Sequence, residues 1–238
     1  MNLIFDVGYN IGEFAAASFK MFPGVRVIGI EANPRLVYGW RALFRRLLFI
    51  LKGHRLTVVN CLLDSEAGRS VKFYISDSSS GLSTASETQK NSSRFALGSK
   101  YLEPATSRWN RTLILETGTL DAMILKFGVP DLIKIDVEGY EWEVLQGLST
   151  RSAAVCFEWH EESHDSTLKC LSRLASIGFR EYGVVGYFEQ GPADGVLHSE
   201  LGGPHLLFPL VFHDISVDVL GSHCDITRRI NWGMIYVR

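Results

Sequence analysis

The stretch Asp6-Val7-Gly8-Tyr9-Asn10-Ile11-Gly12 is the part of the sequence that decides the fold. It follows the apolar residues 3–5, which are typical of a short buried strand, and it leads into a segment with apolar residues at helical spacing. Glycine lets a backbone turn sharply and approach a ligand closely, and the first N–H groups of a helix attract a carboxylate. The stretch therefore predicts a strand, a ligand-binding turn and a helix.

Outward from this stretch, apolar runs alternate with helical patterns along the chain. We expect strands at residues 3–6, 25–30, 56–63, 70–75, 131–136, 153–158, 180–185 and 234–237, and helices at 12–22, 34–51, 119–127, 140–148 and after Asp165, which would cap the last one. A hairpin turn at residues 66–68 would join the third and fourth of these strands. This order predicts one α/β domain over residues 1–238, with a doubly wound, mostly parallel sheet and helices on both faces.

Composition narrows the class of protein. The chain has 238 residues, 46% hydrophobic and 21% charged, with a formal net charge of −2. Such a charge gives no basic excess for nucleic acid or an anionic membrane, and we interpret the basic cluster Arg41, Arg45 and Arg46 as the solvent side of a helix. No apolar run is long enough for a membrane span, no signal peptide is evident, and the four scattered cysteines suit a reducing compartment, so we expect a cytoplasmic protein.

Acidic residues end four of the expected strands: Asp6, Glu31, Asp136 and Glu158. Ligands of doubly wound sheets bind beyond the carboxyl ends of the strands, and an acid at the end of the second strand can hold the hydroxyls of a ribose. Asn10 stands where the dinucleotide fingerprint has its second glycine, which disfavours a diphosphate. S-adenosylmethionine suits the pattern, because it has an ammonium for Asp6, a carboxylate for backbone N–H groups and a ribose for Glu31.

The joint order of five motifs resembles FkbM-type methyltransferases over roughly residues 3–160. The motifs are residues 6–12, Glu31-Ala32-Asn33-Pro34, Leu120-Asp121, residues 133–141 and Val144-Leu145-Gln146-Gly147. The resemblance implies a class I methyltransferase fold, Rossmann-like, with seven strands and an antiparallel last strand. It also implies S-adenosylmethionine as cofactor and methylation of a hydroxyl on a sugar, glycan or natural product.

The same resemblance assigns the cofactor-binding residues by position. Asp6, Gly8, Asn10 and Gly12 would line the methionine part, and Glu31, with Ala32 and Asn33 beside it, would hold the ribose. Cys61 and Leu62 would flank the adenine, and Asp136 would face the methyl region. Tyr9 departs from the small residue usual at its position, and its bulk could narrow the pocket or cap the cofactor.

Three residues are candidates for the chemistry: Asp136, Glu138 and His160. A hydroxyl acceptor benefits from a base, and histidine titrates near neutral pH. Together the three could also bind a divalent ion, although we assign no metal. His160-Glu161-Glu162-Ser163-His164 matches the H-E-x-x-H zinc pattern, but that chemistry needs one helix, and here a strand comes directly before it.

The acceptor side is the least defined part of the sequence. Residues 1–160 would bind the cofactor, while residues 76–111 and 186–229 would form a cap over a small-molecule or glycan acceptor. Three alternatives stay open: a nicotinamide-dependent oxidoreductase, a Rossmann-like binding protein without catalysis, for which Tyr9 is the support, and a metal hydrolase. A homo-oligomer is also open.

Overall fold

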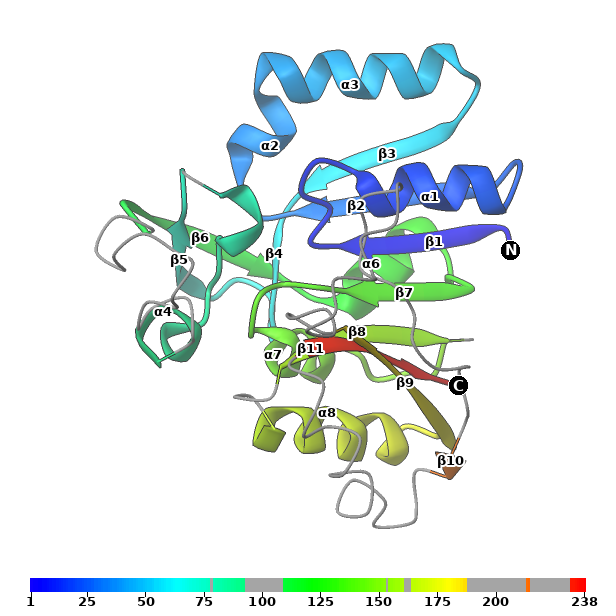
Figure 1. Cartoon of the computed structure of the whole chain (residues 1–238), viewed down its shortest axis with the longest axis vertical. Helices are drawn as coiled ribbons and strands as arrows, with labels where there is room; N and C mark the ends of the chain where they lie inside the picture. The colour runs from blue at the N-terminus through cyan, green and yellow to red at the C-terminus, as the bar shows by residue number, and fades with distance from the viewer. Residues whose placement is uncertain (78, 93–108, 153, 161–163, 188–212, 215–231) are drawn as a thin grey trace, which may run out of the picture.

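The computed structural model describes residues 1–77, 79–92, 109–152, 154–160, 164–187, 213–214 and 232–238. Its main sheet has the order β10-β9-β11-β8-β7-β1-β2-β3 (Figure 1). The strands are β1 (Leu3–Val7), β2 (Arg26–Glu31), β3 (Arg55–Asn60), β7 (Leu132–Ile135), β8 (Val155–His160), β9 (Glu181–Tyr187), β10 (His213–Asp214) and β11 (Trp232–Val237). Strands β3, β2, β1, β7 and β8 are parallel, whereas β11 runs antiparallel between β8 and β9. The doubly wound sheet with an antiparallel last strand is confirmed, and the two-residue β10 extends it at one edge.

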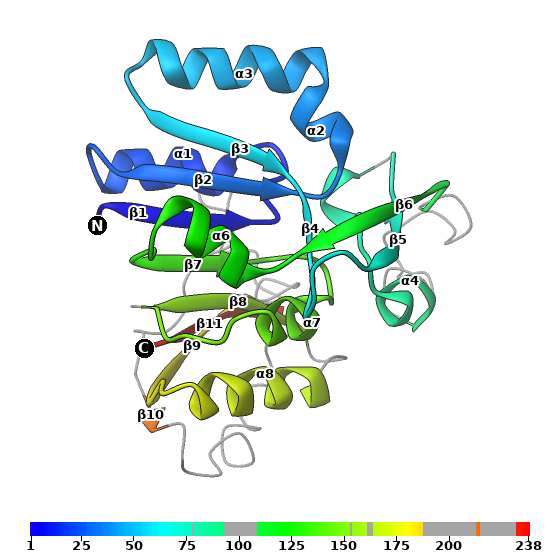
Figure 2. The same ribbon diagram turned by 180° about the vertical axis from the view of Figure 1, so that it is seen from behind.

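Helices cover both faces of this sheet because successive strand residues point to opposite sides. Phe5 and Val7 of β1 pack with α6 (Leu120–Phe127), α7 (Glu141–Gln146) and α8 (His164–Ser176) in one buried cluster. Ile4 packs on the other face against α1 (Glu13–Met21). Figures 1 and 2 show these two layers from opposite sides.

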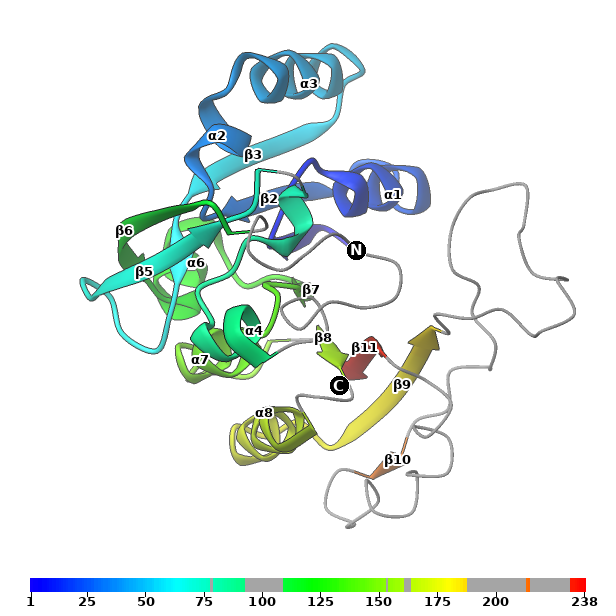
Figure 3. The same cartoon turned by 60° about the vertical axis from the view of Figure 1, so that its left-hand side comes forward.

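A second, three-stranded sheet departs from the prediction. It has the order β4-β6-β5, with β4 at Leu62–Leu63, β5 at Ser70–Ile75 and β6 at Arg111–Gly118. Figure 3 shows β5 beside β6, and Figure 2 shows β4. The expected strand 56–63 is confirmed up to Asn60, but it is wrong beyond that residue, because Leu62–Leu63 form a separate strand of the second sheet. The side chain of Asn60 donates hydrogen bonds to the carbonyl oxygens of Glu31 and Ala32 where β3 ends, and Leu62 then pairs with β6. The expected hairpin is also wrong, because β5 pairs antiparallel with β6, a strand that we did not predict.

The expected helix at 34–51 is in fact two helices, α2 (Pro34–Tyr38) and α3 (Trp40–Leu51). Asn33 caps α2, since its side-chain oxygen accepts a hydrogen bond from the Arg35 N–H at 3.1 Å. Gly39 separates the two helices in an extended conformation, with φ −62° and ψ 146°. A side chain there would meet the carbonyl oxygen of Arg35, so the break depends on glycine.

The predicted cap segments are described only in part. Residues 76–111 contain the single-turn helix η1 (Ser80–Leu82) and α4 (Glu87–Ser92), whereas most of residues 186–229 lie outside the described residues. Helix α8 begins at His164, so Asp165 lies in its first turn and does not cap it. No helix in the described part of the chain has the length and apolar character needed to cross a bilayer.

Candidate active site

A cavity of about 290 Å³ lies at the carboxyl ends of β1, β2, β7 and β8. Residues of these four strands, of the segment after β3 and of the stretch 80–85 line this cavity. Its acidic lining consists of Glu31, Asp136, Glu138 and Glu158, and no described residue that lines it is basic. This arrangement favours a cationic ligand over a diphosphate, because the nearby carboxylates would repel negative charge.

The turn after β1 approaches the end of β7 closely at Gly8. Gly8 has φ +75°, and a Cβ added to it would lie 1.8 Å from the carbonyl oxygen of Asp136. Only glycine fits this position, both for its left-handed backbone and for the contact. Gly8 and Asp136 therefore form one continuous wall of the cavity, as the sequence predicted for two residues at neighbouring strand ends.

Glu31 lies at the end of β2 with its carboxylate held by the backbone. The N–H groups of Asn33 and Asn10 each donate to a different carboxylate oxygen, both at 2.7 Å. Burial raises the pKa of Glu31, and these two hydrogen bonds oppose that shift. Asn10 adopts a left-handed backbone with φ 48°, which asparagine tolerates better than most residues, so it can replace the glycine of the dinucleotide pattern.

The predicted cofactor-binding residues fall into two groups. Gly8, Asn10, Glu31, Ala32, Cys61, Leu62 and Asp136 line the cavity, whereas Asp6, Tyr9, Gly12 and Asn33 do not. Tyr9 is buried, and its ring packs on Gly12 and Gly29, where any added Cβ would clash with it. The ring therefore neither narrows nor caps this cavity. Asn33 contributes its backbone to Glu31, and Gly12 is the left-handed residue before α1.

Asp6 is fully buried beneath the cavity and pairs with Lys134, a residue the sequence analysis did not single out. The Lys134 Nζ lies 3.3 Å from the Asp6 carboxylate and 3.4 Å from that of Asp136, and it donates to the Gly8 carbonyl at 3.1 Å. Burial lowers the pKa of Lys134, but the carboxylates of Asp136 and Asp6 outweigh it and raise the pKa. A lysine in an otherwise apolar strand between two acids is the sequence feature that could have identified this pair. The predicted contact of Asp6 with the ammonium group of the cofactor stays a prediction.

Three carboxylates meet on one side of the cavity. Oxygens of Asp136, Glu138 and Glu158 lie within 4.8 Å of one another. Burial, followed by the charges of Asp136 and Glu141, raises the pKa of Glu158 well above its ordinary value, and Glu158 is hydrogen-bonded to Asp136. The raised pKa favours the protonated form of Glu158. A hard divalent cation could bind three carboxylates of this kind, and it would favour their ionised forms.

The backbone after β7 explains why Glu138 faces the cavity. Glu138 has a left-handed φ of 56°, and the Glu141 side chain accepts hydrogen bonds from the N–H groups of Val137 and Gly139 at 3.1 and 3.2 Å. Glu141 thus holds the turn and does not line the cavity.

His160 is the last residue of β8, and its side chain lies outside what the structure describes. Its predicted catalytic role therefore stays a prediction. His164 begins α8, so the two histidines of the H-E-x-x-H pattern belong to a strand and a helix. Zinc-protease geometry needs both histidines on one helical face, and the backbone described at His160 and His164 places them in different elements.

Residues 80–85 close one side of the cavity and were assigned only loosely from the sequence. The Ser80 hydroxyl donates to the Asn10 side-chain oxygen at 2.8 Å, and the Thr84 hydroxyl donates to the Glu138 carbonyl at 2.7 Å. Both partners are non-glycine residues with a left-handed backbone. The serine-rich composition indicated that hydroxyl groups would make contacts here, but it could not identify Asn10 and Glu138 as their partners.

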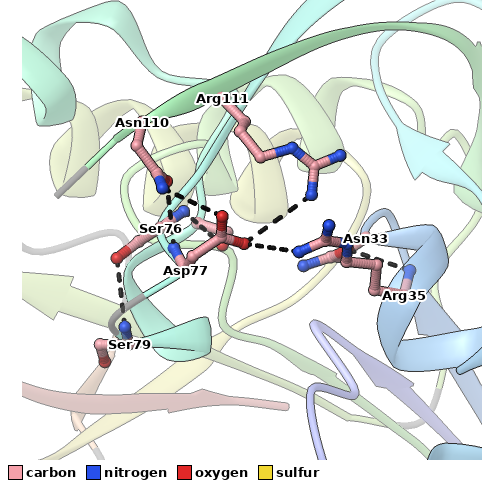
Figure 4. Close-up of polar contacts among 8 residues, drawn as sticks. Asn33, Arg35, Ser76, Asp77, Ser79, Asn110 and Arg111 are labelled. Carbon is pink, nitrogen blue, oxygen red and sulfur yellow. Dashed lines mark hydrogen bonds and ion pairs between the residues drawn. The ribbon is translucent and has the colours of Figure 1, made fainter.

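A second cavity of about 560 Å³ adjoins the first and shares Asn10 and Ser80 with it. Asp77 lies on its rim, where it accepts from Arg35 of α2 at 2.9 Å and from the Asn110 side chain at 3.0 Å, and lies 3.8 Å from Arg111 of β6 (Figure 4). Asp77 therefore ties together both ends of the predicted cap segment 76–111. These groups are partly exposed, so we expect the ion pairs to contribute little to stability.

The strand order and the antiparallel last strand define a class I methyltransferase fold. A family model, the methyltransferase FkbM domain, matches residues 6–181, and the chain belongs to that family. The structure of the methyltransferase FkbM from Methylobacillus flagellatus KT is similar, with a TM-score of 0.50 and 15% identity. That match covers 100% of this chain but 43% of the other, so this chain spans less than half of that protein.

A precorrin-6y C5,15-methyltransferase from Geobacter metallireducens GS-15 is less similar. Its TM-score is 0.46 at 10% identity, over 100% of this chain and 79% of that protein. No curated protein matches the chain in sequence.

Proposed function

We propose that this chain binds S-adenosylmethionine and transfers its methyl group to a hydroxyl of a small-molecule, sugar or glycan acceptor. The observation that carries the proposal is the acidic cavity at the strand ends, in which two backbone N–H groups fix the Glu31 carboxylate. Membership of the FkbM family supports the reaction class.

The residues present fit this cofactor. Each Glu31 oxygen accepts one backbone hydrogen bond and keeps a further acceptor site, which suits the two hydroxyls of a ribose. Cys61 and Leu62 offer an apolar surface for adenine, and burial raises the pKa of the Cys61 thiol, which keeps it neutral. Carboxylates around the cavity would attract the positive sulfonium, and they disfavour the nicotinamide alternative, whose diphosphate is anionic.

The acceptor would occupy the side of the cavity lined by Asp136, Glu138 and Glu158. When bound, the cofactor supplies an electrophilic methyl group, whose bond to sulfur breaks as the acceptor oxygen attacks it. These residues would orient the acceptor hydroxyl and hold its departing proton on a carboxylate oxygen. Asp136 is the candidate that can receive it, because the raised pKa of Glu158 favours the protonated form of that residue.

The reducing, cytoplasmic location remains part of the proposal. Cys61, Cys156 and Cys170 are free thiols, as that location would require. Cell fractionation with an antibody to the chain tests it.

Isothermal titration calorimetry with S-adenosylmethionine and with adenosylhomocysteine tests the cofactor assignment. We expect Glu31→Gln to weaken binding by about 1–3 kcal/mol, since it loses charge-assisted hydrogen bonds. Glu66→Gln is the matched control, because Glu66 is exposed and does not line the cavity, and its affinity should equal that of the wild type. Absence of binding at roughly millimolar cofactor, or equal affinity in both variants, would refute the proposal.

A further inference from the structure

Helix α3 presents an apolar face to solvent, contrary to the interpretation of its arginines as the solvent side of an ordinary surface helix. Not one of its residues is buried. Seven large apolar side chains are between 42% and 74% exposed: Trp40, Leu43, Phe44, Leu47, Leu48, Ile50 and Leu51. Figure 1 shows α3 beyond β3 at the upper end of the molecule, and Figure 2 shows the same from behind.

The geometry of the helix explains which side faces the protein. At 3.6 residues per turn, Ala42, Arg46 and Phe49 share one side, and these are the partly buried residues of α3. Arg46 donates to the Val37 carbonyl at 3.3 Å, and the Phe49 ring lies 5.5 Å from that of Phe19. The exposed apolar residues occupy the opposite side. In the described part of the chain nothing covers them.

Positive charge lies beside this face. Residues 32–63 contain six basic residues and no acidic one, although the whole chain has a net charge of −2: Arg35, Arg41, Arg45, Arg46, Lys52 and Arg55. Arg41, Arg45 and Lys52 follow one flank of the apolar face at helical spacing. An amphipathic helix with a wide apolar face and basic flanks is typical of helices that lie in the interface of an anionic bilayer.

A second copy of the chain fits this surface less well. An isologous dimer brings the same patch of two subunits together, so it would bring two cationic helices into one interface without any acidic partner from residues 32–63. Anionic lipid headgroups supply the opposite charge to these flanks and an apolar layer to the exposed side chains. Charge complementarity therefore selects a lipid surface.

We propose that α3 docks this protein on the surface of an anionic membrane without spanning it. Trp40, Phe44, Leu47 and Leu51 enter the headgroup–acyl boundary, and Arg41 and Lys52 contact lipid phosphates. Trp40, Arg41 and Arg45 also line the second cavity, which adjoins the candidate active site, so a docked membrane lies beside that cavity.

Vesicle flotation of the full chain tests the proposal. We expect binding to phosphatidylcholine vesicles containing about one third phosphatidylglycerol to exceed binding to pure phosphatidylcholine by about tenfold. The double variant Phe44→Glu/Leu51→Glu and the double variant Arg41→Glu/Lys52→Glu should each lose this binding by about tenfold or more. Far-UV circular dichroism and the thermal midpoint check that the variants are folded.

Leu125→Glu is the matched control, because Leu125 is 91% exposed on α6 but lies outside the basic segment. It should bind vesicles as the wild type does. Equal binding to the two kinds of vesicle, binding retained by either double variant, or absence of binding would overturn the proposal. A dimer in analytical ultracentrifugation that Phe44→Glu/Leu51→Glu dissociates, with no vesicle binding, would assign the face to a second copy instead.

Discussion

The ammonium of Lys134 lies 3.3 Å from the carboxylate of Asp6, and both side chains are buried beneath the cavity floor. Lys134 also reaches Asp136 at 3.4 Å, so one buried cation lies between an acid below the cavity and an acid that lines it. The first turn and the end of β7 are thereby connected through charge as well as through backbone contact.

We expect Lys134→Met to destabilise the protein by about 3–5 kcal/mol, because it leaves the Asp6 charge buried without a partner. Urea unfolding measures the loss. The double variant Asp6→Asn/Lys134→Met removes both charges and should recover much of it. A single variant within about 1 kcal/mol of wild type would show that the pair is unimportant for stability.

Gly8→Ala should damage the site more than an equivalent change elsewhere. A left-handed backbone costs alanine about 1–2 kcal/mol, and at Gly8 the methyl group would also overlap the Asp136 carbonyl. Gly68 is the matched control, with φ +80° and nothing within 4 Å of an added Cβ. We expect Gly68→Ala to show only the backbone cost in urea unfolding. Equal losses in the two variants would contradict the close approach of Gly8 to β7.

Stability should depend on pH through Glu158. Burial and the neighbouring carboxylates raise its pKa above the ordinary 4.5 in the folded state, so the unfolded chain releases this proton more readily. The resulting stabilisation is complete below about pH 4.5 and is lost as the pH rises through the folded-state pKa. The Glu158→Gln variant cannot ionise at this position, so its free energy of unfolding does not fall in this way.

Thermal unfolding between about pH 5 and about pH 9 measures the effect. The midpoint of Glu158→Gln should rise relative to wild type as the pH increases, whereas the control Glu66→Gln, at an exposed position, should follow the wild type throughout. A constant difference between Glu158→Gln and wild type across this range would rule out the raised pKa.

Local sequence patterns were enough to predict where the strands end, but they could not predict which distant segments pair with one another. Asp6, Glu31, Asp136 and Glu158 could be recognised because an acid after an apolar run is visible in the sequence. The pairing of β5 with β6 could not, since residues 76–110 separate the two strands and the pattern of 111–118 is weak. Hairpin assignments favour neighbours, and here a distant strand is the partner.

The direction in which side chains point could not be predicted from the sequence either. Helical spacing identifies an amphipathic segment at α3, yet it does not say which side meets the protein, and the structure turns the apolar side outward. The Asp6–Lys134 pair was missed for a similar reason, because the inward direction of a lysine in β7 follows from the register between β1 and β7.

Tyr9 replaces the small residue that is usual in the first turn, and its variants test whether this difference affects cofactor binding. Its ring fills the space over Gly12 and Gly29, and burial raises its pKa to about 12, so the phenol stays neutral at physiological pH. We expect Tyr9→Phe to keep the affinity for adenosylhomocysteine within about twofold of wild type in calorimetry, because the ring does not line the first cavity. Tyr9→Ala should cost about 3–5 kcal/mol of stability through the void it leaves. A tenfold loss of affinity in folded Tyr9→Phe would mean that this side chain reaches the cofactor, and would restore the support that Tyr9 gave to a non-catalytic binding protein.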